Sequence, residues 1–287
     1  MKRTGLLTLM LLPLLTSVQS SPAYAGDDWT DWMSPPWRKQ PTIGIAYGHS
    51  LTNREDLSVA PANTGFAELL LGGTRIAAGD STSSLLRYRL LYFSVANFNS
   101  DYTSSPPAGV PTLNIWRFGF GRRIGYGYRL GGSPEGAALL LYNGGDGALS
   151  SVDIRGIAPG MPDSSVLSQY GGGARFGTSV SGGILLRVTP LIGIDAGFQR
   201  TLVLRRLVFW PWIGSEILEG MLQAGLDGFI DKIGEASPMA KPIAHFVLKN
   251  ALSFGLSQLR RANAYTPFPS EAPLMLDAYR VGLEFTF

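Results

Sequence analysis

Only a few side chains of the kind that commonly perform chemistry occur together in this 287-residue chain. His49 and Ser50 are adjacent, and an imidazole beside a hydroxyl is a combination that activates a serine nucleophile. Adjacent residues on a strand point to opposite faces, so these two are poorly placed to act on each other. Cysteine is absent and the only other histidine is His245, which excludes a disulfide framework and leaves little basis for a histidine metal site. We therefore expect no enzyme.

The glycine-rich segments give no sign of a phosphate-binding site. Gly171-Gly172-Gly173 and Gly119-x-Gly121 are not followed by a helix, and no Lys-Ser/Thr pair completes the motif. The chain is therefore predicted to hold no cofactor and no metal ion.

The first residues of the chain have the layout of a secretory signal peptide. Lys2 and Arg3 precede an apolar stretch from Leu6 to Leu15, and Ala23-Tyr24-Ala25 is a small-x-small cleavage site. We predict a signal peptide over 1–25. Without Lys2 and Arg3 the formal net charge falls from +3 to +1, so a nucleic-acid partner is not expected.

The elements that must position the remaining charged residues are β-strands, because the apolar pattern repeats every second residue. In 114–129 aromatic residues alternate with glycine and arginine, and in 84–98 Leu86 and Tyr88 alternate with Arg87 and Arg89. Arg122 and Arg200 are exceptions on the apolar face, and we interpret Arg122 as a bulge or the end of a membrane band. Eight strands are predicted, at 42–50, 65–77, 84–98, 114–129, 137–144, 169–188, 192–203 and the C-terminal end.

An exported, apolar chain with no run of 18 apolar residues after Ala25 has one way to cross a bilayer, which is a closed β-barrel. The predicted connections alternate between long and short, as they do between the two sides of a membrane barrel. We predict an all-β transmembrane barrel over 41–287 with about eight antiparallel strands, both ends of the chain being periplasmic. Ten strands are the alternative if 148–157 or 201–210 pair. The segment 26–40, with Trp29, Trp32 and Trp37, is predicted to be periplasmic.

A soluble β-sandwich also alternates, but its polar face carries Lys, Thr and Glu rather than the Gly and Arg seen here. We place the alternating charges in the lumen, where they either pair as a polar core or, through the excess of arginine, line an anion-preferring pore. We favour the paired core because eight strands leave little open bore. The predicted lumen-lining residues are Glu68, Arg87, Arg89, Arg117, Arg123, Arg175, Arg187, Asp195, Arg280 and Glu284.

The last strand carries five apolar residues on one face, namely Tyr279, Val281, Leu283, Phe285 and Phe287. With the signal peptide, this pattern resembles the small outer-membrane β-barrel proteins of Gram-negative bacteria. The resemblance implies that the terminal residues are a signal for the barrel-assembly machinery, and that outer-membrane lipids surround the protein in the cell outer membrane.

The insertion at 205–275 changes the apolar period from two to 3.6. An amphipathic helix of about 20 residues is predicted from Ser215 to Gly234, and a second from Pro238 to Arg261. The first is acidic and the second basic, so they are expected to pair as a helical hairpin. Three placements compete: a cap over the barrel mouth, which we favour, a pair on the membrane beside the barrel, and a plug or partner-binding element.

Three functions follow from these predictions. The first is a structural barrel or one that binds a surface or envelope protein through its loops. The alternatives are a narrow channel or transporter for small, possibly anionic, solutes, and a lipid-modifying outer-membrane enzyme.

Overall fold

A computed structural model describes residues 40–78, 84–103, 109–131, 136–157, 160–161 and 163–287. The predicted signal peptide, and the segment 26–40 apart from its last residue, lie outside this range. The strands are β1 (Gln40–Asn53), β2 (Thr64–Ala78), β3 (Leu85–Asn99), β4 (Thr112–Arg129), β5 (Ala138–Arg155), β6 (Ala174–Arg187), β7 (Ile192–Val203) and β8 (Leu274–Thr286).

The strands form a closed barrel in sequence order, and every neighbouring pair is antiparallel. Closure is made by β1 and β8, where Thr42 lies opposite Thr286. Every strand therefore has hydrogen-bonding neighbours on both sides, as a strand in a membrane requires. The eight-strand prediction is confirmed. The ten-strand alternative is wrong, because β5 continues through Arg155 and the segment 201–210 is shared between the end of β7 and the start of a helix.

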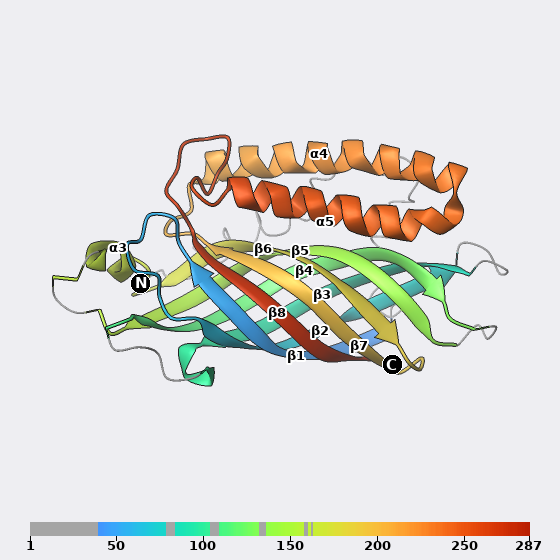
Figure 1. Cartoon of the computed structure of the whole chain (residues 1–287), viewed down its shortest axis with the longest axis horizontal. Coiled ribbons are helices and arrows are strands. Elements are labelled where there is room, and N and C mark those ends of the chain that lie inside the picture. Colours follow the sequence, from blue (N-terminus) through green and yellow to red (C-terminus); the bar gives the residue numbers. More distant parts are fainter. Residues whose placement is uncertain (1–39, 79–83, 104–108, 132–135, 158–159, 162) are drawn as a thin grey trace, which may run out of the picture.

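The two ends of the barrel differ in their connections. The strands are joined through 79–84, 130–137 and 188–191 at the end where β1 begins and β8 finishes. At the other end, which we call the loop end, the strands are joined through 54–63, 100–111, 156–173 and 204–273 (Figure 1). It also carries the 3₁₀ turn η2 (Ser100–Tyr102) and the short helix α3 (Ser164–Ser168). The predicted alternation of long and short connections is confirmed.

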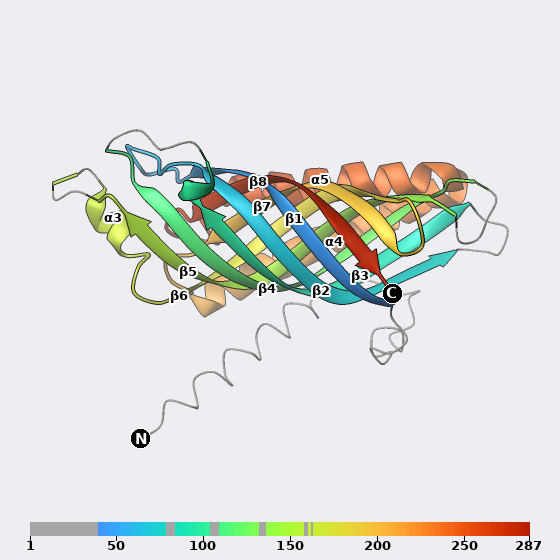
Figure 2. The same ribbon diagram turned by 90° about the horizontal axis from the view of Figure 1, so that it is seen from below.

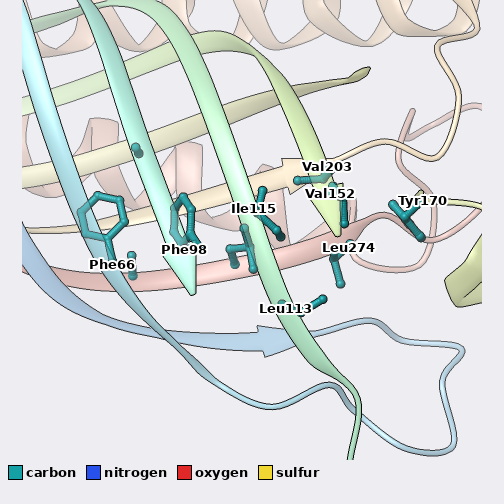
Figure 3. Close-up of a cluster of buried hydrophobic side chains, with 11 residues drawn as sticks. Phe66, Phe98, Leu113, Ile115, Val152, Tyr170, Val203 and Leu274 are labelled. Atoms are coloured by element: carbon teal, nitrogen blue, oxygen red, sulfur yellow. The ribbon is translucent and has the colours of Figure 1, made fainter. Parts of the chain in front are cut away.

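Apolar clusters close both halves of the lumen. The cluster at the loop end contains Phe66 and Phe98, whose ring centroids lie 4.8 Å apart, together with Leu113, Ile115 and Leu274 (Figure 3). The cluster at the opposite end is made of Leu70, Leu86, Tyr88, Leu90, Tyr92, Ala138, Leu140, Tyr142 and Leu185. Since an eight-stranded barrel is only wide enough for side chains to fill, these clusters occupy the bore.

The second cluster overturns the prediction for β3. Leu86, Tyr88, Leu90 and Tyr92 are buried in the lumen, so the residues between them point outward. Arg87 lies opposite Tyr126 of β4, and its guanidinium carbon is 6.0 Å from the centre of that ring. Both faces of β3 hold large side chains, so alternation alone left the direction of the strand open. Arg87 and Arg89 are not lumen residues.

The helical hairpin consists of α4 (Phe209–Ala236), the 3₁₀ turn η3 (Pro238–Ala240) and α5 (Lys241–Leu259). It lies lengthwise along the outer wall of the barrel, over β4, β5 and β6 (Figures 1 and 2). The favoured prediction of a cap over the mouth is wrong, and so is that of a plug. The prediction of a helix pair on the membrane beside the barrel is correct in placing the helices outside the barrel. The helices, however, run along the barrel axis (Figure 1). Among the helices of the described residues, none combines the length and overall apolarity needed to cross a membrane.

Candidate functional site

Charged and phenolic side chains from six strands meet in the middle of the lumen, between the two apolar clusters. The arginines are Arg117, Arg123 and Arg280, and the carboxylates are Glu68, Asp146, Asp195 and Glu284. All seven are buried. We call this group the lumen network. An unpaired charge buried in the lumen is very unfavourable, so the stability of the barrel depends on the ion pairs within the lumen network.

Arg280 of β8 is the centre of the network. Its guanidinium reaches Glu68 at 2.7 Å (Nη1–Oε2) and Asp195 at 3.0 Å (Nη2–Oδ2). It also donates a hydrogen bond of 2.8 Å to the hydroxyl of Tyr142, which in turn donates one of 2.7 Å to Asp195. Arg123 approaches Asp195 at 3.2 Å, so this carboxylate is shared by two arginines and a phenol. The result ties β2, β4, β5, β7 and β8 together across the bore.

Arg117 of β4 extends the network towards the loop end. It forms an ion pair with Asp146 and donates a hydrogen bond of 2.8 Å to the hydroxyl of Ser179. The second oxygen of Asp146 accepts a hydrogen bond of 3.0 Å from Tyr92. Charge-assisted bonds of this kind are the strong ones, and here they join β3, β4, β5 and β6.

The other predicted lumen arginines lie at the two barrel ends. Arg175 donates hydrogen bonds to backbone carbonyls of the loop connections, including those of Tyr170 and Arg205. Arg187 donates to the carbonyl of Pro190 in the turn between β6 and β7. The structure therefore brings together Glu68, Arg117, Arg123, Asp195, Arg280 and Glu284, but not Arg87, Arg89, Arg175 or Arg187.

Sequence reasoning missed Asp146 and the three tyrosines that contact the lumen network, which are Tyr92, Tyr142 and Tyr88, the last donating a hydrogen bond to Glu284. Asp146 lies in Asn143-Gly144-Gly145-Asp146-Gly147, a composition typical of turns, beyond the end of the predicted strand 137–144. Pairing on both sides keeps this segment in β5, where Asp146 lies opposite Gly121 and Ser179. In the sequence both faces of 140–148 mix apolar, glycine and polar residues, so no alternation marks Asp146 as part of a strand.

The corrected network removes the basis for an anion-preferring pore. That hypothesis rested on seven arginines against three acidic residues. The lumen network instead has three arginines and four carboxylates, and each arginine touches at least one carboxylate. Such a balanced, cross-linked arrangement fills the bore and offers no stretch of free positive charge.

A second polar cluster lies outside the barrel, between its wall and the hairpin. A cavity of about 200 Å³ is bordered by Arg122, Asn143, Glu219, Asp227 and Lys249. β4 is paired without interruption through Arg122, so the predicted bulge is wrong. Arg122 and Arg200 are exceptions to the apolar face because the hairpin covers them. A cavity of this size and polarity has room for several water molecules.

The predicted pair His49 and Ser50 is divided between the faces of β1. Ser50 is fully buried on the lumen side, whereas His49 points outward and lies opposite Tyr279. Within the described part of the chain, no group of three or more His, Cys, Asp or Glu side chains is placed to hold a metal ion.

At the loop end, Arg54 and Asp56 fasten the connection after β1 to the loop before β6. Arg54 donates hydrogen bonds to both carboxylate oxygens of Asp56, at 2.5 and 2.9 Å, and one of 2.6 Å to the hydroxyl of Tyr170. The hydrogen bond from Arg54 holds the pKa of the Asp56 carboxyl below its usual value.

Comparison with known proteins finds no protein family that matches the chain, and no curated protein matches it either. Two solved structures are similar in outline. Neisserial surface protein A has 10% sequence identity and a TM-score of 0.37, over 86% of this chain and 96% of its own. Ail, the attachment invasion locus protein of Yersinia pestis, has 9% identity and a TM-score of 0.34, over 87% of this chain and 99% of its own. Because both TM-scores are low, the assignment of the fold rests on the strand pairing within the chain itself.

Proposed function

We propose that the protein is an integral outer-membrane barrel with a closed lumen and a structural or surface-interaction role. The observation that carries this proposal is the filled bore, in which the lumen network lies between two apolar clusters. A channel needs a continuous polar path, and here the buried charges are bound to one another. The same proposal includes export by the predicted signal peptide and insertion by the barrel-assembly machinery through Tyr279 to Phe287. It also includes a surface or envelope protein that binds the loops.

The outward side chains support placement in a bilayer. Exposed apolar residues cover the wall where the hairpin does not, among them Ile45, Leu71, Phe93, Val281 and Leu283. The terminal residues Tyr279, Val281, Leu283 and Phe287 are all exposed on this outer face. A soluble barrel would turn polar residues to this side, since contiguous exposed apolar surface is rare in soluble monomers.

Solute flux into vesicles tests the closed lumen. The full chain is reconstituted into phosphatidylcholine vesicles, and entry of chloride, gluconate and a small sugar is compared with empty vesicles and with vesicles holding a known porin. We expect flux equal to that of empty vesicles. Flux of any of these solutes that rises with protein content would overturn the closed-lumen proposal and favour the channel.

A lipid-modifying role has no supporting geometry at His49 and Ser50. The expected result for His49→Ala is an unchanged lipid A and phospholipid profile in cells that make the protein. A change in either profile would reinstate the enzyme.

A further inference from the structure

The helical hairpin has the reverse of the usual polarity of a surface helix. The exposed residues in the central part of α4 are Ile217, Leu218, Met221, Leu222, Gly225, Gly228 and Phe229, and none is charged. On α5 the exposed residues are Ile243, Val247, Ala251, Phe254, Gly255, Gln258 and Leu259, and again none is charged. A helix on a water-facing surface turns its polar side outward, so this outer face is not built for water.

Away from the tip, the charges of the hairpin lie on its inner side, where they are paired. Lys249 contacts Asp227 at 2.6 Å (Nζ–Oδ1), and its ammonium also donates a hydrogen bond to the carbonyl of Gln223. Arg260 reaches Glu219 at 3.0 Å and Glu216 at 3.3 Å. These ion pairs confirm the predicted pairing of an acidic and a basic helix. They also explain why the overall apolarity of each helix is low although its outer face is apolar.

The barrel wall carries polar groups among its apolar residues where the hairpin covers it. Asn143 of β5 donates a hydrogen bond of 3.0 Å to Asn250 of α5, and Arg200 of β7 donates one of 2.7 Å to Gln258. At the hairpin tip, the hydroxyl of Tyr128 donates one of 2.6 Å to the carbonyl of Met239. These polar groups face outward at positions where exposed strands carry apolar side chains. The hairpin therefore separates them from whatever surrounds the barrel.

The dimensions of the hairpin match a bilayer. The 19 residues of α5 extend about 28 Å, close to the hydrocarbon thickness of about 30 Å. Exposed charges return at both ends of the apolar face, with Arg206 before α4 and with Asp231, Lys232 and Glu235 near the tip. Trp210 is 77% exposed at the loop-end boundary, the position favoured by aromatic residues at membrane interfaces.

We propose that the outer face of the hairpin contacts the acyl chains of membrane lipids and continues the lipid-facing band of the barrel. This rests on the proposed membrane location of the barrel. The argument for lipid rather than a second copy of the chain is continuity: the ring of Phe198 packs both on exposed Phe254 of α5 and on exposed Tyr279 of β8, which joins the apolar face of the hairpin to the apolar wall. The apolar side of the hairpin faces the lipid, and its polar side packs against β4 to β7.

Spin-label accessibility tests this proposal, and the cysteine-free chain makes single-site labelling direct. Met221→Cys, Phe229→Cys and Val247→Cys are labelled on the hairpin, in the full chain reconstituted into phosphatidylcholine–phosphatidylglycerol vesicles. Leu71→Cys on β2 is the lipid-facing control, and Asp153→Cys at the loop end is the water-facing control. Heat-dependent gel mobility verifies that each variant is folded. Collisions with oxygen, which concentrates in acyl chains, are compared with collisions with a water-soluble nickel chelate.

We expect the oxygen-to-nickel ratio at the three hairpin sites to equal that at position 71 within about twofold, and to exceed that at position 153 several-fold. A ratio like that at position 153, with position 71 behaving as lipid-facing, would put the hairpin in water and overturn the inference alone. Low collision rates with both reagents would indicate a covering protein, such as a second copy, and would also overturn it. A water-like ratio at position 71 would instead overturn the membrane barrel.

Discussion

Arg200 and Asp277 form a bidentate ion pair on the outer wall of the barrel. Both contacts, Nε–Oδ1 and Nη2–Oδ2, are 2.6 Å long. The residues lie directly opposite each other on β7 and β8, on the face that carries apolar residues elsewhere. α5 shields the pair, and the guanidinium of Arg200 lies 4.3 Å from the ring centre of Phe254. An ion pair at this position is compatible with a lipid-facing wall only because the hairpin covers it.

The value of that ion pair is measurable by a double-mutant cycle. Arg200→Leu or Asp277→Leu alone leaves a poorly solvated partner, so each is expected to cost about 3 kcal/mol of stability. The double variant removes both charges and is expected to recover part of this loss, giving a coupling energy of about 1–3 kcal/mol. Urea unfolding in detergent micelles is the measurement. Strict additivity of the two single losses would contradict the shielded pair.

Arg280 is predicted to be the most sensitive charge of the lumen network. Arg280→Met leaves Glu68 and Asp195 without their shared guanidinium, and breaking a buried pair in this way costs about 3–5 kcal/mol. The urea midpoint should therefore fall well below that of the native chain. The matched control is Arg155→Met, which breaks an exposed pair with Asp153 and should cost less than about 1 kcal/mol. Equal effects of the two substitutions would refute the structural role of the network.

Gly182 is a point of close approach between the wall and α5. A Cβ at this position would collide with the side-chain amide of Asn250. Gly182→Leu is therefore expected to lift α5 and to speed amide hydrogen exchange across 241–259, while β1 to β3 keep their protection. Gly255→Leu is the control, because it places the same side chain in open space on the other side of α5. Unchanged exchange in Gly182→Leu would show that the hairpin is not held at this contact.

The contact between Arg54 and Asp56 should weaken in acid. The folded-state pKa of Asp56 is lowered, so its contribution is complete above the unfolded pKa of about 3.9 and is lost as the pH falls through the folded value. The carboxylate is 48% exposed, so the effect should be only about 0.5 kcal/mol. Carboxyl ¹³C shifts in micelles report the pKa directly. A value at or above that of a free aspartate would contradict the hydrogen bond, and Asp56→Asn should abolish this part of the pH dependence.

Much of the fold was open to prediction because a barrel strand repeats its environment every second residue. The last strand illustrates this: Tyr279 and Val281 face outward while Arg280 and Glu284 face the lumen, as their alternation required. Glu68, Arg117, Arg123 and Asp195 lie buried in the lumen network. The predicted hairpin helices were found with their acidic and basic partners, although α4 begins earlier than expected, at Phe209.

The rest depended on contacts between distant segments. Alternation defines two faces of a strand but not which one points inward when both carry bulky residues. The prediction of Arg87 and Arg89 in the lumen is wrong for this reason, since Tyr88 lies there. Asp146 required two neighbouring strands to hold a turn-like sequence in β5. By itself the sequence determined the strands, the residues that share one face of a strand, and the amphipathic helices, because all of these follow from local periodicity. Only the tertiary structure decided that the hairpin docks on the outer wall, since docking depends on Arg122, Asn143 and Arg200 meeting polar groups from residues up to about a hundred positions away.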